Sequence, residues 1–361
     1  MVKICLKNLE VEPTASCIFR RNFSSKILCL NNEFKMGFGI IPIFILKIAK
    51  AKLYIFFIFP QKYFEYVWLK IKTGIIQKSK MCMTKKIAFQ GAAGANSDLA
   101  CRQFYPDYTT IPNGSFFDVF KAVENGEVDY GMIPLENSYA GRVSEIHNLL
   151  QDGNISIIAE HFVQIEHHLA VSKGAILEDI TEIYSHPQAL MQCRKNLSAL
   201  HVKQIECSNT AEAARFISGQ NSKNKAALCS KLAAELNNLE IIKSNMQDSG
   251  DENFTIFIVI SKQAIDPDPA QGKVITTMLF TVRNIPGAVY KALGGFATNN
   301  VNLLKWESYI PSGKSSQAKF FISIEGHPSE ANVGLALEEV GFFSKSVKLL
   351  GVYYADKSRY Q

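Results

Sequence analysis

The sequence predicts an α/β fold with a two-lobed body over residues 85–262 and a smaller βαββαβ unit over residues 274–354. In the body, short apolar runs alternate with amphipathic segments that carry helix-capping residues. This pattern is typical of a parallel or mixed sheet covered by helices. The smaller unit instead follows the element order of a ferredoxin-like fold. A chain of 361 residues is long enough for two or three such domains.

The first 82 residues differ in composition from the rest of the chain. They hold 14 lysines and arginines against 4 acidic residues, whereas the remainder carries a net charge of −4. The apolar runs at 37–46 and 53–60 are shorter than the about 20 residues that cross a bilayer as a helix. This leader is interpreted either as a basic membrane-surface segment or, more simply, as upstream sequence outside the working protein. A natural start for that protein is Met83.

The charge and the cysteines restrict the class of protein. The mildly acidic body lacks the basic stripe of a nucleic-acid-binding protein, so neither a nucleic acid nor a membrane is an expected partner of the body. None of the eight cysteines forms a CxxC pair, which favours reduced thiols in a cytoplasmic protein. No metal site is expected, because His167 and His168 are neighbours on a strand and point to opposite faces.

The first lobe is predicted over about residues 85–162 and 245–262. It begins with a short strand, a glycine turn ending at Gly94, and a helix that Asn96 or Ser97 can cap. Such a helix start offers free N–H groups to an anion. The simpler interpretation is an ordinary strand, turn and capped helix that binds no ligand. The sequence has neither the dinucleotide-binding fingerprint nor a Walker motif at this turn.

A second helix of this lobe is predicted over residues 115–126. Ser115 provides its N-cap, and Gly126 ends it. The segments directly before and after it in the sequence are predicted to be strands. This helix therefore connects two strands of one sheet.

Residues 128–141 (VDYGMIPLENSYAG) open as a buried strand and close as a polar turn. Pro134 is expected to end the regular ladder, because it has no N–H to donate. Glu136, Asn137 and Ser138 then place a carboxylate, an amide and a hydroxyl just past the strand end, where ligands of open α/β sheets bind. The simpler alternative is a loop in which the asparagine and serine satisfy their own backbone.

The second lobe is predicted over about residues 163–244. Its helices begin near Pro187, Thr210 and Ser230, and each of them follows a predicted strand. His186 and Gln188 flank Pro187, which is favourable at the first position of a helix. The chain then returns to the first lobe through residues 248–261, which are predicted to form a strand.

Taken in order, these segments resemble the prephenate dehydratase family. The segments that match the family at its usual spacings are 91–97 (GAAGANS), 136–138 (ENS), 185–190 (SHPQAL) and 248 with 253–257 (D…NFTIF). The resemblance covers about residues 85–354. It implies a bilobal body like that of periplasmic binding proteins, and conversion of prephenate to phenylpyruvate by loss of CO2 and the ring hydroxyl. It also implies that no cofactor takes part.

The resemblance also implies roles for individual residues. Thr255 matches the essential catalytic hydroxyl of the family, and Glu136, Asn137 and Ser138 would orient the substrate or support a proton relay. The substrate-binding residues that it implies are Gly94, Asn96, Ser97, His186, Gln188 and Phe257.

One position departs from the family pattern. The family reads Thr-Arg-Phe where this chain has Thr255, Ile256 and Phe257. The missing guanidinium could have paired with a substrate carboxylate or with a neighbouring side chain. Two alternatives therefore stay open: a non-catalytic binding protein for a small acid or amino acid with the same fold, and an arogenate dehydratase.

The C-terminal unit resembles the ACT regulatory domain that is attached to these enzymes. The residues that match the family's two phenylalanine-binding segments are Asn284, Pro286, Gly287, Ala288, Val289, Glu307 and Ser308. The family's usual Arg-Pro after Glu-Ser is Tyr309-Ile310 here. The resemblance implies feedback inhibition by phenylalanine in a homodimer or homotetramer. An ordinary α+β dimerisation domain is the alternative.

Overall fold

The computed structural model describes residues 27–35, 40–48, 53–58, 84–248, 253–310 and 318–360. The chain divides into two compact units, residues 1–83 and 84–361. In the first unit, three antiparallel strands pair in the order β1 (Ile27–Lys35), β2 (Ile40–Ile48) and β3 (Leu53–Ile58). The second unit contains the predicted body and the C-terminal part.

The first sheet of the second unit has the strand order β5-β4-β6-β14-β8. Strands β4, β5 and β6 are parallel, and β14 pairs antiparallel with both β6 and β8. The predicted mixed α/β fold is therefore confirmed. The elements are β4 (Lys86–Gln90), α2 (Asn96–Phe104), β5 (Thr109–Asn113), α3 (Phe116–Asn125), β6 (Tyr130–Asn137), β7 (Gly141–Arg142), α4 (Ser144–Asp152), β8 (Ser156–Gln164) and β14 (Phe254–Ser261).

The helix caps of this sheet follow the sequence at α3 and differ from it at α2. Ser115 and Asp118 form a capping box at the start of α3, and Gly126 ends the helix with φ +72°, as predicted. Helix α2 begins after Ala95 without a side-chain cap, so the prediction that Asn96 or Ser97 caps it is wrong. The buried Asp98 instead accepts the Gly94 N–H at 2.9 Å, which leaves the first N–H groups of α2 without a cap.

Strand β6 runs further than Pro134, so the prediction that this proline ends the ladder is wrong. Glu136 and Asn137 are the last two residues of the strand. Pro134 lies opposite Phe257 and Glu136 lies opposite Ile256, so Leu135 is an extra residue in β6. This irregularity accommodates the missing N–H, and a bulge of this kind re-aims the side chains that follow it.

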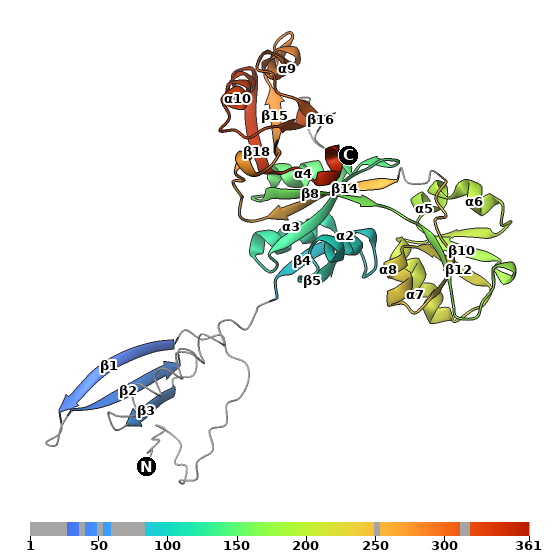
Figure 1. Cartoon of the computed structure of the whole chain (residues 1–361), viewed down its shortest axis with the longest axis horizontal. Helices are drawn as coiled ribbons and strands as arrows, with labels where there is room; N and C mark the ends of the chain where they lie inside the picture. The colour runs from blue at the N-terminus through green and yellow to red at the C-terminus, as the bar shows by residue number, and fades with distance from the viewer. Residues whose placement is uncertain are drawn as a thin grey trace. The chain divides into compact units, whose positions relative to one another are not determined.

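The second sheet has the strand order β11-β10-β12-β9-β13. Strands β10, β11 and β12 are parallel, and β9 pairs antiparallel with β12 and β13. Figure 1 shows its helices covering the sheet in yellow-green. The elements are β9 (His168–Val171), β10 (Glu182–Ser185), α5 (Pro187–Gln192), α6 (Arg194–Ser198), β11 (Lys203–Glu206), α7 (Thr210–Gln220), β12 (Lys225–Cys229), α8 (Lys231–Leu236) and β13 (Glu240–Lys243).

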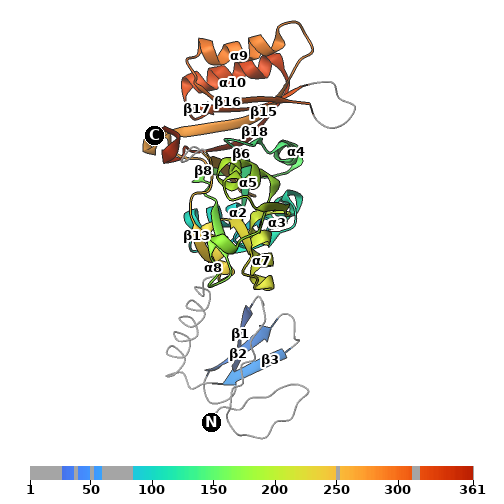
Figure 2. The same cartoon turned by 90° about the vertical axis from the view of Figure 1, so that its right-hand side faces the viewer.

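The C-terminal sheet is antiparallel and has the strand order β16-β17-β15-β18. Helices α9 and α10 pack on one face, as Figure 2 shows. The other face shares a hydrophobic core with the first sheet, where Leu279 and Tyr353 join Ile133 and Ile258. The hairpin turn predicted at 311–314 lies outside the described residues. The elements are β15 (Val274–Val282), α9 (Ala288–Thr298), β16 (Leu303–Tyr309), β17 (Lys319–Glu325), α10 (Ala331–Phe343) and β18 (Ser344–Tyr354).

Among the described residues, no helix has both the length and the apolar character that crossing a bilayer requires.

Candidate active site

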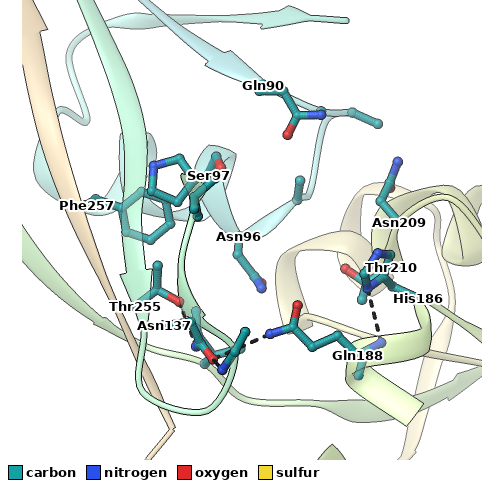
Figure 3. Close-up of a pocket in the computed structure, with 18 of the residues that line it drawn as sticks. Gln90, Asn96, Ser97, Asn137, His186, Gln188, Asn209, Thr210, Thr255 and Phe257 are labelled. Atoms are coloured by element: carbon teal, nitrogen blue, oxygen red, sulfur yellow. Dashed lines mark hydrogen bonds between the residues drawn. The ribbon is translucent and has the colours of Figure 1, made fainter. Parts of the chain in front are cut away.

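A cavity of about 900 Å³ is lined by residues of both the first and the second sheet. Figure 3 shows Thr255, Phe257 and Asn137 on one side of it, and His186, Gln188 and Thr210 on the other. This volume suits a small organic ligand. Of the residues singled out from the sequence, those that line it are Asn96, Ser97, Glu136, Asn137, His186, Gln188, Thr255 and Phe257.

Thr255 and Asn137 form the central polar contact of this cavity. They are cross-strand partners at the ends of β14 and β6, and Asn137 Nδ2 donates to Thr255 Oγ1 at 3.0 Å. Thr255 is only 8% exposed. Because its oxygen accepts this bond, the threonine hydroxyl keeps its own proton available for a ligand.

The orientation of the Asn137 amide follows from its surroundings. Its Oδ1 accepts the backbone N–H groups of Tyr139 and Ala140 at 3.1 and 2.9 Å. The amide nitrogen must therefore face the other way, towards Thr255 and the Oδ1 of Asn253, which is 3.0 Å away. The turn after β6 thus sets which end of Asn137 meets the threonine.

Helix starts from both sheets face the cavity. Asn96 and Ser97 begin α2, while Asn209 caps α7 by accepting the N–H of Glu212 at 2.7 Å. His186 caps the short helix α5, because its Nδ1 accepts the Gln188 N–H at 3.2 Å. The positive ends of α2 and α7 favour an anion between them.

Two of the expected site residues do not line the cavity. Gly94 has φ +89° and packs against α8, where a Cβ would lie 2.7 Å from the Cα of Ala233. It provides a close approach of the two sheets, reinforced by the bond from Ser230 Oγ to its carbonyl at 2.8 Å. Ser138 continues the pairing of β6 with β14, and its Oγ accepts the Phe254 N–H at 3.2 Å.

Sequence reasoning missed several polar residues of the cavity. Gln192 lies one turn beyond Gln188 on α5, and its Nε2 lies 3.4 Å from Asn137 Oδ1. Arg142 is the only lysine or arginine among the described residues that line the cavity. Arg142 directly follows the polar turn in the sequence, and this position could have identified it as a site residue. Gln90 and Asn113 were missed as well, whereas the predicted helix start at Ser208, Asn209 and Thr210 does line the cavity, as does His167.

His167 is a buried neutral base at the cavity wall. Burial lowers its pKa, although the hydrogen bond to Gln192 acts in the opposite direction. Its Nε2 lies 2.9 Å from Gln192 Oε1, an acceptor, so Nε2 carries the proton. His168 does not line the cavity, which agrees with the expectation that at most one of the pair faces it.

The cysteines of the described residues offer no reactive thiolate. Burial raises the pKa of Cys193 and of Cys229 to about 12 in each case. Among these residues there is also no cluster of three or more histidine, cysteine or acidic side chains that would hold a metal ion. The described part of the cavity has hydroxyl, amide, imidazole and guanidinium groups and the carboxylate of Glu136 for chemistry.

The expected phenylalanine-binding residues lie in two segments of the C-terminal part. Asn284 to Val289 form the turn into α9, with Gly287 in the left-handed region at φ +71°. Glu307 and Ser308 lie near the end of β16. The Glu307 carboxylate contacts Lys305 at 2.7 Å and His147 of α4 at 2.9 Å, so it faces the body.

The chain is similar to known proteins over most of its length. A family model described as "Prephenate dehydratase" matches residues 87–265. A bifunctional N-acyl-homoserine lactone acylase/prephenate dehydratase of Komagataeibacter europaeus is 42% identical, over 76% of this chain and 97% of the relative. A bifunctional chorismate mutase/prephenate dehydratase of Aquifex aeolicus is 34% identical, over 82% of this chain and 80% of the relative.

A solved structure agrees with this assignment. The prephenate dehydratase of Arthrobacter aurescens in complex with L-Phe has a TM-score of 0.68 and 29% identity, and the match covers 74% of this chain and 89% of that one. The resemblance and the enzyme class expected from the sequence, a carbon–oxygen lyase, are confirmed. The chain belongs to the prephenate dehydratase family.

Proposed function

We propose that this protein converts prephenate to phenylpyruvate, with its two sheets acting as lobes around the cavity. The observation that carries the proposal is the bond from Asn137 Nδ2 to Thr255 Oγ1, which leaves the threonine proton available to a ligand. In the reaction, the ring carboxylate leaves as CO2. Its electron pair forms the aromatic ring and expels the hydroxyl, which takes a proton and departs as water. Aromatisation drives this step, so it needs no oxidant or reductant.

Thr255 assists the departure of the hydroxyl. A threonine is a weak acid, so its contribution is a hydrogen bond that strengthens as negative charge develops on the leaving oxygen. Asn137 holds the threonine oxygen in place, Gln192 in turn bonds the Asn137 amide oxygen, and neither contributes a charge of its own. Burial of Thr255 removes competing water and strengthens this hydrogen bond.

The substrate's two carboxylates meet the positive groups of the cavity. The starts of α2 and α7 provide N–H groups from opposite sides, and Arg142 provides a guanidinium. The carboxylate of Glu136, the cross-strand partner of Arg142, also lines the cavity, but Lys305 contacts it and offsets its charge. The cavity is thus suited to a dianion.

The charge of the cavity also favours prephenate over arogenate, which carries an ammonium group where prephenate has a keto group. Glu136 is the only carboxylate among the described residues that line the cavity, and it already contacts Lys305. An ammonium would therefore find no unpaired carboxylate there. We expect purified full-length protein to form phenylpyruvate from prephenate with a higher kcat/KM than it forms phenylalanine from arogenate. The reverse order would reassign the substrate, and no turnover of either would leave the non-catalytic binding protein.

We also propose that residues 274–354 act as an ACT domain that binds phenylalanine and lowers activity. The turn into α9 supplies backbone N–H groups for the carboxylate of an amino acid, and β16 supplies the Ser308 segment. Within one copy of the chain, Glu307 faces the body, so a second copy in a homodimer or homotetramer completes the site.

The regulatory proposal has its own measurement. Phenylalanine should bind the full-length protein in a calorimeter and lower the rate with prephenate. The variant Gly287→Val should weaken both effects together, because its side chain is strained at φ +71°. Inhibition that survives without measurable binding to this variant would contradict the site. Cytoplasmic location and the role of residues 1–82 stay predictions from the sequence.

A further inference from the structure

A row of charged side chains joins the active-site turn to the C-terminal sheet. Lys305 of β16 contacts the Glu136 carboxylate at the end of β6, across 169 positions of sequence. The same ammonium lies 2.7 Å from Glu307 Oε1. Glu307 Oε2 lies 2.9 Å from His147 Nε2 of α4, close enough for an ion pair although the two atoms are not aligned as a hydrogen bond.

These groups are largely removed from water. The side chains of Lys305 and Glu307 are 13% and 15% exposed, and that of His147 is 1% exposed. Burial alone would raise the pKa of the Glu307 carboxyl, but His147 and Lys305 outweigh it and lower that pKa to about 2. The lysine is thus held between two carboxylates, of which Glu307 is weakly screened by water and Glu136, with a side chain 34% exposed, is screened more.

The position of Glu136 gives the contact a consequence for the active site. Glu136 precedes Asn137, whose amide bonds Thr255, and it follows the extra residue Leu135 in β6. A chain segment at a bulge is not fixed by regular ladder bonds alone. An ion pair on Glu136 therefore restrains the turn that orients Asn137.

A second contact holds the same turn to the same strand. Arg142, the cross-strand partner of Glu136, donates from Nη1 to the Ser308 carbonyl at 3.0 Å. The turn is thus attached to β16 at both of its ends. Only the Lys305 contact, however, reaches the residue next to Asn137.

We propose that Lys305 is a positioning residue of the dehydratase site, which acts from the C-terminal sheet through Glu136. Lys305 touches neither the substrate nor the reacting atoms. The inference rests on the proposed dehydratase reaction. A shift of β16 against the first sheet would move the Glu136 carboxylate, and with it the amide that orients Thr255. The C-terminal part then helps to position the active-site turn, in addition to being a candidate regulatory unit.

Substitutions in the full-length protein test this role. Because small displacements of a positioned group cost up to about 10²-fold in rate, we expect Lys305→Met to lower kcat about tenfold with a KM change of less than about twofold. Lys305→Arg keeps the charge and should return kcat to within about threefold. If Glu136 transmits the effect, the double variant Glu136→Gln/Lys305→Met should be no slower than Glu136→Gln alone.

Lys348 provides a matched control. It also extends from the C-terminal sheet to the body, where its Nζ donates to the carbonyls of Leu150, Gln151 and Gly153 at 3.0, 2.8 and 2.7 Å. Lys348→Met should lower the melting temperature and leave kcat within about twofold, because these contacts stabilise only the end of α4. An equal loss of kcat in both lysine variants, or additive losses in the double variant, would overturn the positioning role.

Hydrogen exchange separates this inference from the proposed function. If the wild type turns over neither prephenate nor arogenate, the function fails, but the restraint on the turn is still measurable. Amide exchange over residues 134–142 should be faster in Lys305→Met than in the wild type and in Lys348→Met. Equal exchange in all three proteins would overturn the inference, whatever their activity.

Discussion

The cavity and the contact between the body and the C-terminal sheet use polar groups in opposite ways. The cavity places a hydroxyl, amides and helix starts around a ligand, and Thr255, Asn137 and Gln192 carry no charge. The contact with the C-terminal sheet instead pairs full charges, as in Glu136 with Lys305 and Glu160 with Arg359. Neutral groups thus surround Thr255, whereas ion pairs connect the two parts of the chain, and the charged Glu136 and Arg142 belong to both places.

This difference follows from what each place requires. A leaving hydroxyl needs one proton donor that is held still, and a network of neutral bonds provides that without a large desolvation cost. Between two parts of a chain, buried charges give specificity of position, since an unpaired charge there is strongly unfavourable. The two regions should therefore respond mainly to different measurements, rate for the cavity and stability for the contact, except at Glu136 and Lys305, where the contact reaches the active-site turn.

The largest expected effect is on rate in the cavity. Thr255→Val removes the proton donor and keeps the shape, so kcat should fall on the order of 10³-fold while the melting temperature changes little. Thr255→Ser keeps the hydroxyl and should lose far less activity. A valine variant with near-normal kcat would show that another group assists the hydroxyl.

The next effect is on stability at the C-terminal contact. Arg359 donates to both oxygens of Glu160 at 2.6 Å, and the Glu160 side chain is 2% exposed. Arg359→Met leaves this carboxylate buried without its cation, so the free energy of unfolding should fall by about 3 kcal/mol. Urea denaturation measures this change. Lys121→Met, which breaks the exposed pair with Glu124, is the control and should cost less than about 1 kcal/mol.

Arg142 belongs to both regions and tests where they meet. Its guanidinium lines the cavity and also bonds the Ser308 carbonyl. Arg142→Met should raise KM for prephenate about tenfold, because it removes the cavity's guanidinium, with a smaller fall in kcat. Arg142→Lys should recover part of the loss. A change in melting temperature with no change in KM would assign this residue to the contact alone.

A smaller effect should appear as a dependence on pH. The pKa of Glu307 is lowered from 4.5 to about 2 in the folded chain, where it faces Lys305 and His147. Its carboxylate therefore stabilises the fold above the ordinary pKa, and this stabilisation is lost as the pH falls towards 2. The urea midpoint of Glu307→Gln should lie below that of the wild type at pH 7, and the gap should narrow as the pH falls from 4.5 to 3. A gap that stays constant in that range would contradict the ionic role.

The sequence predicted well those features that depend on neighbouring residues. The Ser115 cap and the Gly126 stop lie ten or so positions apart on one helix, and local geometry decides both. Pro134 was misjudged because the extra residue at Leu135 depends on the partner strand β14, which is distant in sequence. The cavity residues that follow helix starts were found for the same local reason.

Long-range contacts of charged residues could not be predicted in this way. The Lys305–Glu136 contact joins residues 169 positions apart, and neither residue has an unusual local pattern. Gly94 was expected at the ligand, but its positive φ serves the packing of the two sheets, which a glycine in a turn does not reveal. Such contacts depend on how sheets pack, and composition and periodicity do not specify that packing.

The smallest effect concerns Ile256, where the family has arginine. Thr255 and Phe257 line the cavity, whereas Ile256 does not and lies opposite Glu136 across the ladder. An arginine at this position would face a carboxylate that Lys305 already contacts. We therefore expect Ile256→Arg alone to change kcat/KM by less than about threefold.

The same substitution should matter once Lys305 is lost. In the Lys305→Met background, Ile256→Arg offers Glu136 a new cation from the neighbouring strand, so part of the lost kcat should return. Steady-state rates with prephenate for the four proteins of this cycle decide the question. A rise of tenfold or more in the wild-type background would show instead that the missing guanidinium limits the reaction directly, and that Lys305 does not replace it.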